Sequence, residues 1–177
     1  MSVISAIAFS GFVHAGKTTA ARSLEDLGFC YCRPSIVLAK VLAEREQNVT
    51  REFLQAVGNE IHASGEQVWL ISETVKSCEA ARLIAVDGIR WSEDRAYLAE
   101  RFGEGFLHVH IAATESTLIA RHIALGGSTD GYRAVAAHDV ESGIPELASS
   151  ADVTLTNDGA LEDFRESIRR IALRFIE

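Results

Sequence analysis

Short apolar runs alternate along this chain with segments whose apolar residues recur at helical spacing. The runs are rich in β-branched or aromatic side chains and have the length of buried strands. They lie at residues 3–9, 29–32, 83–86, 107–111 and 153–156. This pattern predicts a sheet of about five strands, because each run has the length of one strand.

Helical stripes occupy much of the sequence between these runs. Phe53, Val57 and Ile61 recur every four residues behind Thr50, a residue type that caps helices. Near the end of the chain a second apolar stripe lies opposite charged positions; it consists of Leu161, Phe164, Ile168, Ile171 and Phe175. Alternating strands and helices predict one α/β domain over residues 1–177, with a parallel sheet between two helical layers.

Two stretches depart from this alternation. Residues 34–80 contain helical patterns and no strand, which predicts a helical insertion between the second and third strands, suited to binding a substrate. Residues 126–137 begin with a glycine-rich, polar sequence. We expect the second stretch to pack poorly, either as a lid over a site or as a mobile loop.

Composition and charge narrow the classes of function. The chain has 177 residues, of which 47% are hydrophobic, and a formal net charge of −8 without any lysine- or arginine-rich run. Nucleic-acid binding is disfavoured, because it relies on a basic surface that releases counterions. No apolar run has the length of a membrane span, and the first residues lack the pattern of a secretion signal. We therefore expect a cytoplasmic protein with no membrane partner.

The cysteines and one pair of histidines are candidate metal ligands. Cys30, Cys32 and Cys78 lack paired metal-ligand spacing, and we interpret them as free thiols in a reducing compartment. His108 and His110 lie on one face of a predicted strand without a third ligand, so packing explains them better than a metal.

Residues 11–18 match the phosphate-binding pattern Gly-x-x-x-x-Gly-Lys-Thr, directly after a predicted strand and before a helix predicted over 19–27. Gly11 and Gly16 let the backbone curl around an oxyanion, where a side chain would collide with it. Lys17 reaches the β- and γ-phosphates, and the Thr18 hydroxyl ligates magnesium. This P-loop predicts ATP and magnesium as ligands, and a P-loop NTPase fold. A dinucleotide loop is excluded, because Gly-x-Gly-x-x-Gly is absent.

Three other positions of this loop are counted with the nucleotide-binding residues: His14, Ala15 and Thr19. His14 occupies a variable position of the motif. Both a phosphate contact and a solvent-facing ring are therefore compatible with the pattern.

Asp87 ends the apolar run 83–86, and Arg90 follows three residues later. In P-loop proteins an acidic residue at the end of a buried strand belongs to the magnesium shell, and ligands bind at those strand ends. Asp87 is therefore a candidate to hold magnesium or to accept a proton from the acceptor, and Arg90 is a candidate to clamp a second phosphate. A plain turn at Asp87 and Gly88 remains the alternative.

Phosphoryl transfer also requires flanking cations that neutralise charge. Arg121, before the glycine-rich stretch, is a candidate for contact with the nucleotide and for the transfer step, and Arg133, within that stretch, is a candidate on the acceptor side. Arg33, Ser35 and Arg51 are candidates to face an acceptor phosphate from the insertion. Each arginine alone also fits a solvated surface position.

Together with the P-loop and residues 87–90, three ordered segments resemble the phage-type deoxynucleoside monophosphate kinases and, more distantly, dephospho-CoA kinase. Residues 51–60 are similar to the family's Arg-x-x-Leu-Gln-x-x-Gly helix. Residues 138–145 match its His-x-x-Glu-x-Gly segment, and residues 151–159 match its strand followed by Asn-Asp-Gly. The resemblance covers nearly the whole chain.

This resemblance implies a nucleoside monophosphate kinase-like fold and ATP-dependent phosphorylation of a (deoxy)nucleoside monophosphate. It implies that Lys17 and Thr18 contact ATP and magnesium, that Arg90 contacts the acceptor phosphate, and that the segment after Arg121 covers the site. It also places Asn157 near the adenine, although a helix cap explains this residue equally well. The oligomeric state stays open, a homodimer included.

Two other functions remain open on the sequence alone. One is a kinase for another small metabolite, dephospho-CoA included. The other is a nucleotide-responsive binding module with weak ATPase activity, because the glycine-rich stretch offers only Arg133 after Arg121.

Overall fold

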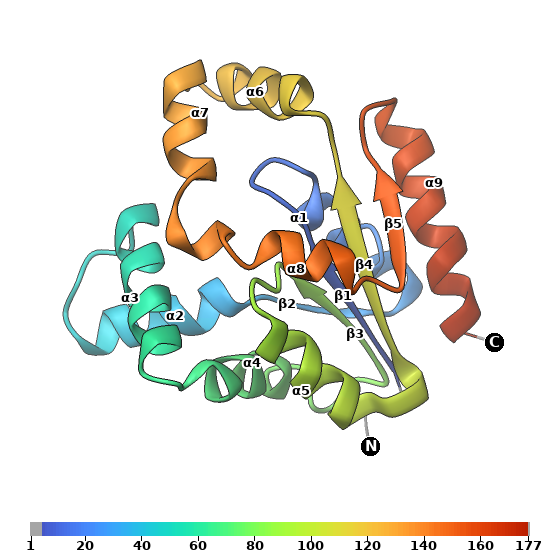
Figure 1. The fold of residues 1–177 in the computed structure, drawn as a ribbon. Coiled ribbons are helices and arrows are strands. Elements are labelled where there is room, and N and C mark those ends of the chain that lie inside the picture. The colour runs from blue at the N-terminus through green and yellow to red at the C-terminus, as the bar shows by residue number, and fades with distance from the viewer. Residues whose placement is uncertain (1–4, 177) are drawn as a thin grey trace.

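The strands of the protein form one parallel sheet in the order β2-β3-β1-β4-β5 (Figure 1). The computed structural model describes residues 5–176, apart from the side chain of Val140. Within that part the strands are β1 Ser5–Ser10, β2 Cys30–Cys32, β3 Leu83–Asp87, β4 Phe106–Ala112 and β5 Val153–Thr156. Each coincides with a predicted run to within a residue or two, so the prediction of about five strands is confirmed; residues 3 and 4 of the first run lie outside the described residues.

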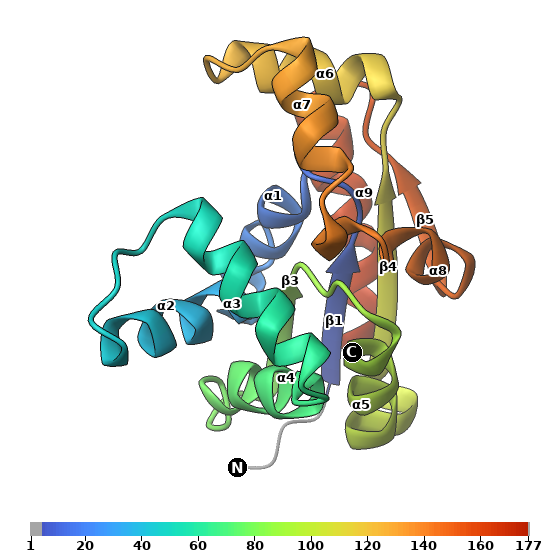
Figure 2. The ribbon, with the colours of Figure 1, turned by 60° about the vertical axis from the view of Figure 1, so that its left-hand side comes forward.

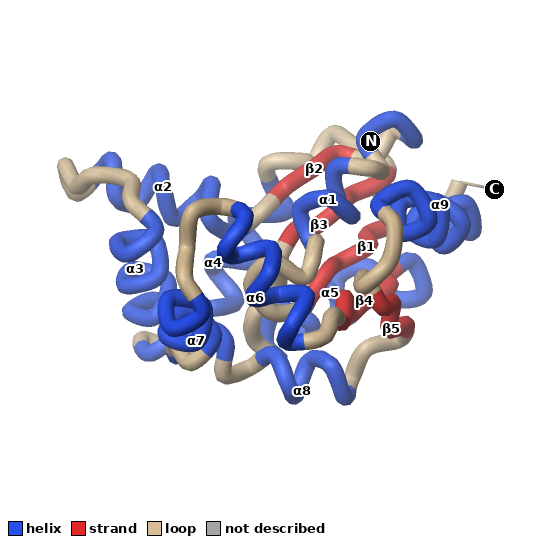
Figure 3. Tube along the Cα trace, turned by 90° about the horizontal axis from the view of Figure 1, so that it is seen from above, coloured by secondary structure: helices blue, strands red, loops and turns tan. Residues whose placement is uncertain are grey.

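Helices cover both faces of this sheet. They are α1 Lys17–Arg22, α2 Pro34–Glu44, α3 Arg51–Ala63, α4 Gln67–Lys76, α5 Ser92–Phe102, α6 Glu115–Ala124, α7 Thr129–Ala136, α8 Ile144–Ser149 and α9 Leu161–Ala172. Viewed from above, α1 and α9 lie on one side of the sheet and α5 and α8 on the other (Figure 3). The predicted three-layer architecture is confirmed.

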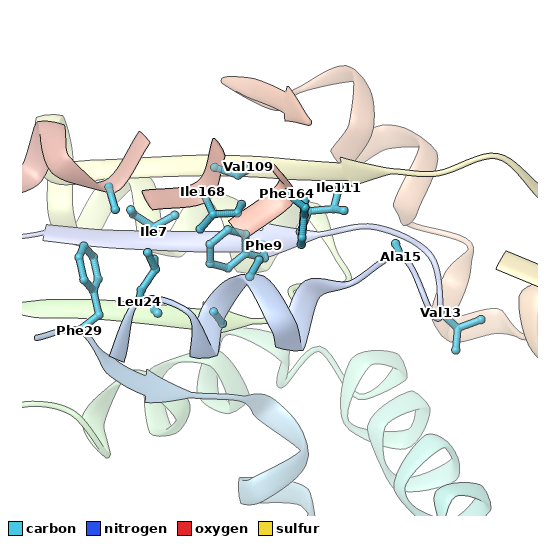
Figure 4. Packing of buried hydrophobic residues seen from close by; sticks show 14 of the residues in the cluster. Ile7, Phe9, Val13, Ala15, Leu24, Phe29, Val109, Ile111, Phe164 and Ile168 are labelled. Carbon is cyan, nitrogen blue, oxygen red and sulfur yellow. The ribbon is translucent and has the colours of Figure 1, made fainter. Parts of the chain in front are cut away.

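Alternate residues of β1 supply the two halves of the core. Ile7 and Phe9 pack with Leu24, just after α1, and with Phe164 and Ile168 of α9 (Figure 4). Ala6 and Ala8 face the opposite cluster, which contains residues of α4, α5 and α8. Because both faces of the strand are buried, its sequence is continuously apolar rather than alternating.

The stretch 34–80 contains α2, α3 and α4 and, like the prediction, no strand. In Figure 2, α2 and α3 stand to the left of the sheet, and α6 and α7 lie above it. The insertion helices α2, α3 and α4 share a small core, which consists of Val37, Leu38, Leu42, Val57, Ile61 and Leu70. The insertion is therefore packed as a unit against the edge of the domain.

Two local predictions are wrong. The helix expected over 19–27 begins at Lys17, leaves α-helical geometry after Arg22, and ends in a 3₁₀ turn at Glu25–Leu27. The stretch 126–137, expected to pack poorly, is largely the helix α7. The Ser128 side chain caps this helix by accepting from the Gly131 N–H, and Tyr132 is only 4% exposed. The glycine content of this stretch predicted a loop, although the stretch forms a capped amphipathic helix.

The prediction of free thiols is wrong for two of the three cysteines. Cys30 on β2 forms a disulfide with Cys78, just after α4. Cys32 is free and buried, and burial raises the pKa of its thiol to about 12. The argument for a reducing compartment therefore loses its support. Among the described helices, none combines the length and the apolar character that crossing a bilayer requires.

The Cys30–Cys78 disulfide is expected to contribute to stability by closing a loop. Since the two cysteines are 48 residues apart, Cys78→Ser should lower the free energy of unfolding by about 2–4 kcal/mol. Denaturant unfolding without reductant measures this loss, and a reductant should bring the wild type down to the variant. Cys32→Ser is the control, because its effect should be the same with and without reductant. Equal stability of Cys78→Ser and wild type in oxidising buffer would refute the prediction.

Candidate functional site

The P-loop connects β1 to α1 and depends on glycine at two positions. Gly11 has φ +141° and Gly16 has φ +111°, in the range that side chains disfavour. A Cβ at Gly11 would collide with the Ile111 carbonyl, and one at Gly16 would collide with the Asn157 amide. The sequence analysis explained both glycines by the phosphate alone; neighbouring chain segments require them as well.

Lys17 is buried at the first position of α1, with 8% of its surface exposed. Its Nζ donates to the carbonyls of Gly11, at 2.6 Å, and Phe12, at 2.8 Å. Burial lowers the pKa of this ammonium group well below its usual value, and the nearby Arg90 lowers it further. The side chain thus lies across its own loop in an environment that favours an added anion.

Arg121 and Asn157 support the P-loop from outside. The Arg121 guanidinium donates to the carbonyls of His14, at 3.1 Å, and Asn157, at 2.7 Å. The Asn157 side chain donates to the carbonyl of Ala15 at 2.7 Å and is itself only 6% exposed. Both residues, predicted as nucleotide contacts, therefore bind loop carbonyls, which orients the loop for its ligand.

Asp87 lies where the sequence analysis placed it, at the end of β3 beside the P-loop. Its Oδ2 accepts hydrogen bonds from the hydroxyls of Thr18 and Tyr31, each at 2.7 Å. Arg33 Nε lies 3.9 Å from the same oxygen, and Asp87 is 4% exposed. Burial, and then the hydrogen bond to Asp87, raise the pKa of Tyr31 to about 12. Thr18 and Asp87 thus place two hard oxygen atoms side by side, the type of donor that Mg²⁺ prefers.

A cavity of about 360 Å³ opens between the P-loop, the end of β3 and the insertion helices. Lys17, Thr18 and Asp87 line it. Arg33, Ser35, Arg51 and Arg90 also line it, together with Leu38, Leu54, Gln67, Leu70, Trp91 and Asp94. The structure therefore gathers every predicted acceptor residue around one space, apart from Arg133.

Arg133 lies elsewhere, on α7. Its side chain is 65% exposed and lies 3.7 Å from Asp130 on the same helix. Arg133 does not line this cavity. It also does not line a second groove beside the P-loop, which is described below.

Arg90 has a buried partner that the sequence analysis missed. Its Nη1 forms an ion pair with Glu141, whose side chain is 1% exposed. Burial lowers the pKa of the Arg90 guanidinium to about 10 against the opposing effect of Asp87. Glu141 belongs to the segment 138–145, which the sequence analysis singled out without assigning this residue a role. The pair fixes the guanidinium in the cavity wall.

The cavity is also lined by residues that the sequence analysis did not predict, among them Gln67, Trp91 and Asp94. Asp94 is fully buried, and it accepts from the Gln67 amide at 2.5 Å and from the Arg90 N–H at 2.8 Å. Gln67 is 4% exposed, and its Oε1 has no hydrogen-bond partner. The Trp91 ring stacks on His62 with centroids 3.6 Å apart. A glutamine with an unpartnered acceptor oxygen, an aromatic ring and arginines therefore line the same cavity.

A second, more open groove of about 560 Å³ lies on the opposite side of the P-loop. His14, Gly16, Lys17, Thr18, Thr19, Arg121, Ala124 and Leu125 line it. His14 lines both this groove and the cavity described above. Its Nε2 lies 2.9 Å from Nδ1 of His122 on α6.

The histidine pair on β4 is buried. Ser10 Oγ lies 2.7 Å from His108 Nε2 and 2.9 Å from His110 Nδ1, which joins β1 to β4 through side chains. Burial lowers the pKa of His108 to about 4, so this ring is neutral in the core. The hydrogen bonds with Ser10 agree with a packing role.

Comparison with known proteins extends this description. No protein-family model matches the chain. Its relatives include a UPF0200 protein of Pyrobaculum aerophilum, 28% identical over 177 residues, which cover 97% of this chain and 98% of that protein. A UPF0200 protein of Methanosarcina mazei is 26% identical over 97% of this chain and 95% of its own length.

Solved structures give the fold. Shikimate kinase from Acinetobacter baumannii matches with a TM-score of 0.63 and 19% identity, over 97% of this chain and 94% of that one. A gluconokinase from Sinorhizobium meliloti matches at 0.60 with 13% identity, over 98% and 97%. The APS kinase of Mycobacterium tuberculosis, in complex with AMPPNP and APS, matches at 0.56 with 13% identity, over 98% and 99%. The fold is that of the P-loop kinases.

Proposed function

We propose that this protein transfers the γ-phosphoryl group of ATP to a nucleoside monophosphate, deoxynucleotides included. One observation carries the proposal. A single cavity is lined by the P-loop lysine, the Thr18–Asp87 pair and three arginines. Such a cavity suits transfer from one phosphate to another, because both the donor and the acceptor group need cationic partners.

The donor side is supported by the loop and its hydroxyl–carboxylate pair. Lys17 would move from its loop carbonyls to the phosphates, where its charge is better compensated than in its present surroundings. Thr18 and Asp87 would hold magnesium, which supplies neutralisation of phosphate charge when bound. Arg121 and Asn157 keep the loop in shape through its carbonyls, an indirect role in place of the predicted contact with ATP.

The acceptor side is supported by the distribution of polar and apolar groups. Arg33, Arg51 and Arg90 provide more cationic donors than a hydroxylated, uncharged acceptor would need. Trp91 and the leucines that line the cavity offer apolar surface for a flat base. The unpartnered Gln67 Oε1 there favours a ligand that carries an N–H donor. A nucleoside monophosphate has both features, in agreement with the resemblance to phage-type deoxynucleoside monophosphate kinases.

A second candidate is a nucleotide-responsive module with weak ATPase activity. The position of Arg133 favours it, because this arginine is solvent-exposed and paired with Asp130 rather than turned toward the phosphates. This candidate predicts ADP release without any acceptor.

A screen of acceptors with ATP and magnesium, reading ADP release, tests the proposal. We expect turnover with at least one (deoxy)nucleoside monophosphate and little with dephospho-CoA or with unphosphorylated nucleosides. Arg90→Met with Glu141→Gln removes the clamp without leaving Glu141 as an unpaired buried charge. This double variant should lower kcat/KM for the phosphorylated acceptor by about 10²-fold. ATP turnover that no acceptor stimulates would refute kinase activity. An equal loss toward phosphorylated and unphosphorylated acceptors would refute the clamp.

The Glu141→Gln single variant separates the clamp from its support. It leaves the Arg90 charge in place and removes the carboxylate that fixes it, so KM for the acceptor should rise more than kcat falls.

A further inference from the structure

His14 and His122 join the P-loop to α6 through a hydrogen bond between their ring nitrogens, 2.9 Å apart. His14 has φ +65°, a left-handed conformation that is uncommon outside glycine. Such backbone strain is concentrated at functional sites. Like Lys17 and Thr18, His14 lines both the cavity and the groove beside the P-loop.

The packing around His122 fixes its ring toward His14. A Cβ at Gly127 would collide with the His122 ring, and one at Gly131 would come 3.2 Å from its Nε2. The Tyr132 ring meets it edge-on, with centroids 6.0 Å apart. Gly127, Gly131 and the Tyr132 ring thus form the space that the His122 ring occupies. His122 is a positioning residue for His14.

The charges facing the pair are cationic. Lys17 comes from the P-loop, Arg121 from α6 and Arg51 from α3, while α7 contributes Tyr132. Burial lowers the pKa of His14, and the charges of His122, Arg51, Lys17 and Arg121 lower it further, in that order. A polyphosphate beside the loop would reverse the sign of this local field.

We propose that His14 and His122 form a proton-binding pair that takes up one proton from solvent when a nucleoside triphosphate binds. The inference rests on the proposed function, because it requires a triphosphate at the P-loop. The hydrogen bond accommodates the proton: an imidazolium N–H donates to the neutral ring, and this charge-assisted bond is stronger than the neutral one. A second proton would leave two donors facing each other, so the pair takes up one proton only.

The added charge has a place in this site. Arg133 of α7 is exposed and does not line the groove. From α6, Arg121 lines the groove, and His122 contacts His14, which also lines it. The protonated pair supplies a further positive charge between donor and acceptor phosphates, where charge on the transferred group must be neutralised. It also tightens the link between α6 and the P-loop while nucleotide is bound.

The direction of the pH dependence follows from the sign of the two shifts. In the free protein the pKa of His14 lies below its usual value of 6.5, so the His14 ring is neutral near pH 7. Bound phosphates raise it, and proton uptake occurs between the free and the bound pKa. Uptake should fall at lower pH, where the free pair is already protonated, and at higher pH, where the bound pair stays neutral.

Calorimetric titration with magnesium–AMPPNP, in buffers of low and high ionisation enthalpy, measures the protons taken up. The comparison is the double variant His14→Asn with His122→Gln, which cannot titrate; asparagine tolerates the left-handed conformation. Because the nucleotide's own protonation is common to both proteins, only their difference counts. We expect the wild type to take up at least about half a proton more per nucleotide near pH 7.

Equal proton uptake by wild type and double variant would overturn the pair while leaving the proposed function intact. Absence of any binding heat in the wild type would instead overturn the proposed function and the pair with it. The single variant His122→Gln gives a further test, because it can keep a hydrogen bond to His14 but cannot share a proton. Its nucleotide affinity should depend less on pH than that of the wild type, and unchanged pH dependence would count against the pair.

Discussion

Lys17→Ala is expected to lower kcat for phosphoryl transfer by about 10³-fold or more, because it removes the charge that faces the phosphates at the moment of transfer. Lys17 is buried beside three arginines, and no other lysine lines the cavity in the described part of the chain. Steady-state kinetics with saturating ATP and the best acceptor of the screen measure the effect. Activity within about tenfold of the wild type would refute the site assignment.

Lys17→Met controls for the volume that alanine removes. The lowered pKa of Lys17 means that folding disfavours its charged form, so this charge destabilises the native state below the unfolded-state pKa. Replacing it by a neutral side chain of similar length should leave the melting temperature at or above that of the wild type. Loss of activity in a fully folded Lys17→Met protein would therefore reflect chemistry alone.

The sheet could be predicted because its signal is local. All strands pair in parallel, and helices cover both faces, so each strand is a short continuous apolar run. The P-loop was equally accessible, since its pattern, the strand before it and the helix after it are contiguous in sequence. Asp87 and Arg90 followed from the rule that ligands bind at strand ends.

The missed features depend on contacts between distant segments. Glu141 lies 51 residues from Arg90, and only the folded chain brings the carboxylate to the guanidinium. Cys30 and Cys78 are 48 residues apart and meet because α4 ends beside β2. The cysteine that pairs with Cys30 cannot be chosen from the spacing in the sequence, because three cysteines allow more than one pairing.

Other errors arose where composition was a poor guide to packing. The glycine-rich stretch suggested a loose segment, yet the cap at Ser128 and the burial of Tyr132 stabilise α7 there. Gly127 is small because the His122 ring occupies the adjacent space. The amide of Asn157, a residue predicted near the adenine, donates to the carbonyl of Ala15, a contact that does not test this prediction. In each case the residue type was visible and its contact was not.

Asp87→Asn is expected to lower kcat by about 10²–10⁴-fold while leaving ATP affinity equal or tighter. The substitution removes a negative charge that at present favours the charged forms of Lys17 and Arg90. Without this charge the wall of the cavity becomes more positive, which favours a bound polyphosphate. Turnover still falls, because the amide neither holds magnesium as a carboxylate does nor accepts a proton from the acceptor.

Tyr31→Phe is the matched control. It removes one of the two hydroxyls that donate to Asp87 Oδ2 and keeps the carboxylate charge, so turnover should fall by less than about tenfold. The asparagine oxygen can still accept from Thr18, so both variants should remain folded. Titration of nucleotide and steady-state rates separate the two effects. If Asp87→Asn weakened ATP binding and left kcat unchanged, Asp87 would act only in ground-state binding, and its place in the transfer step would be lost.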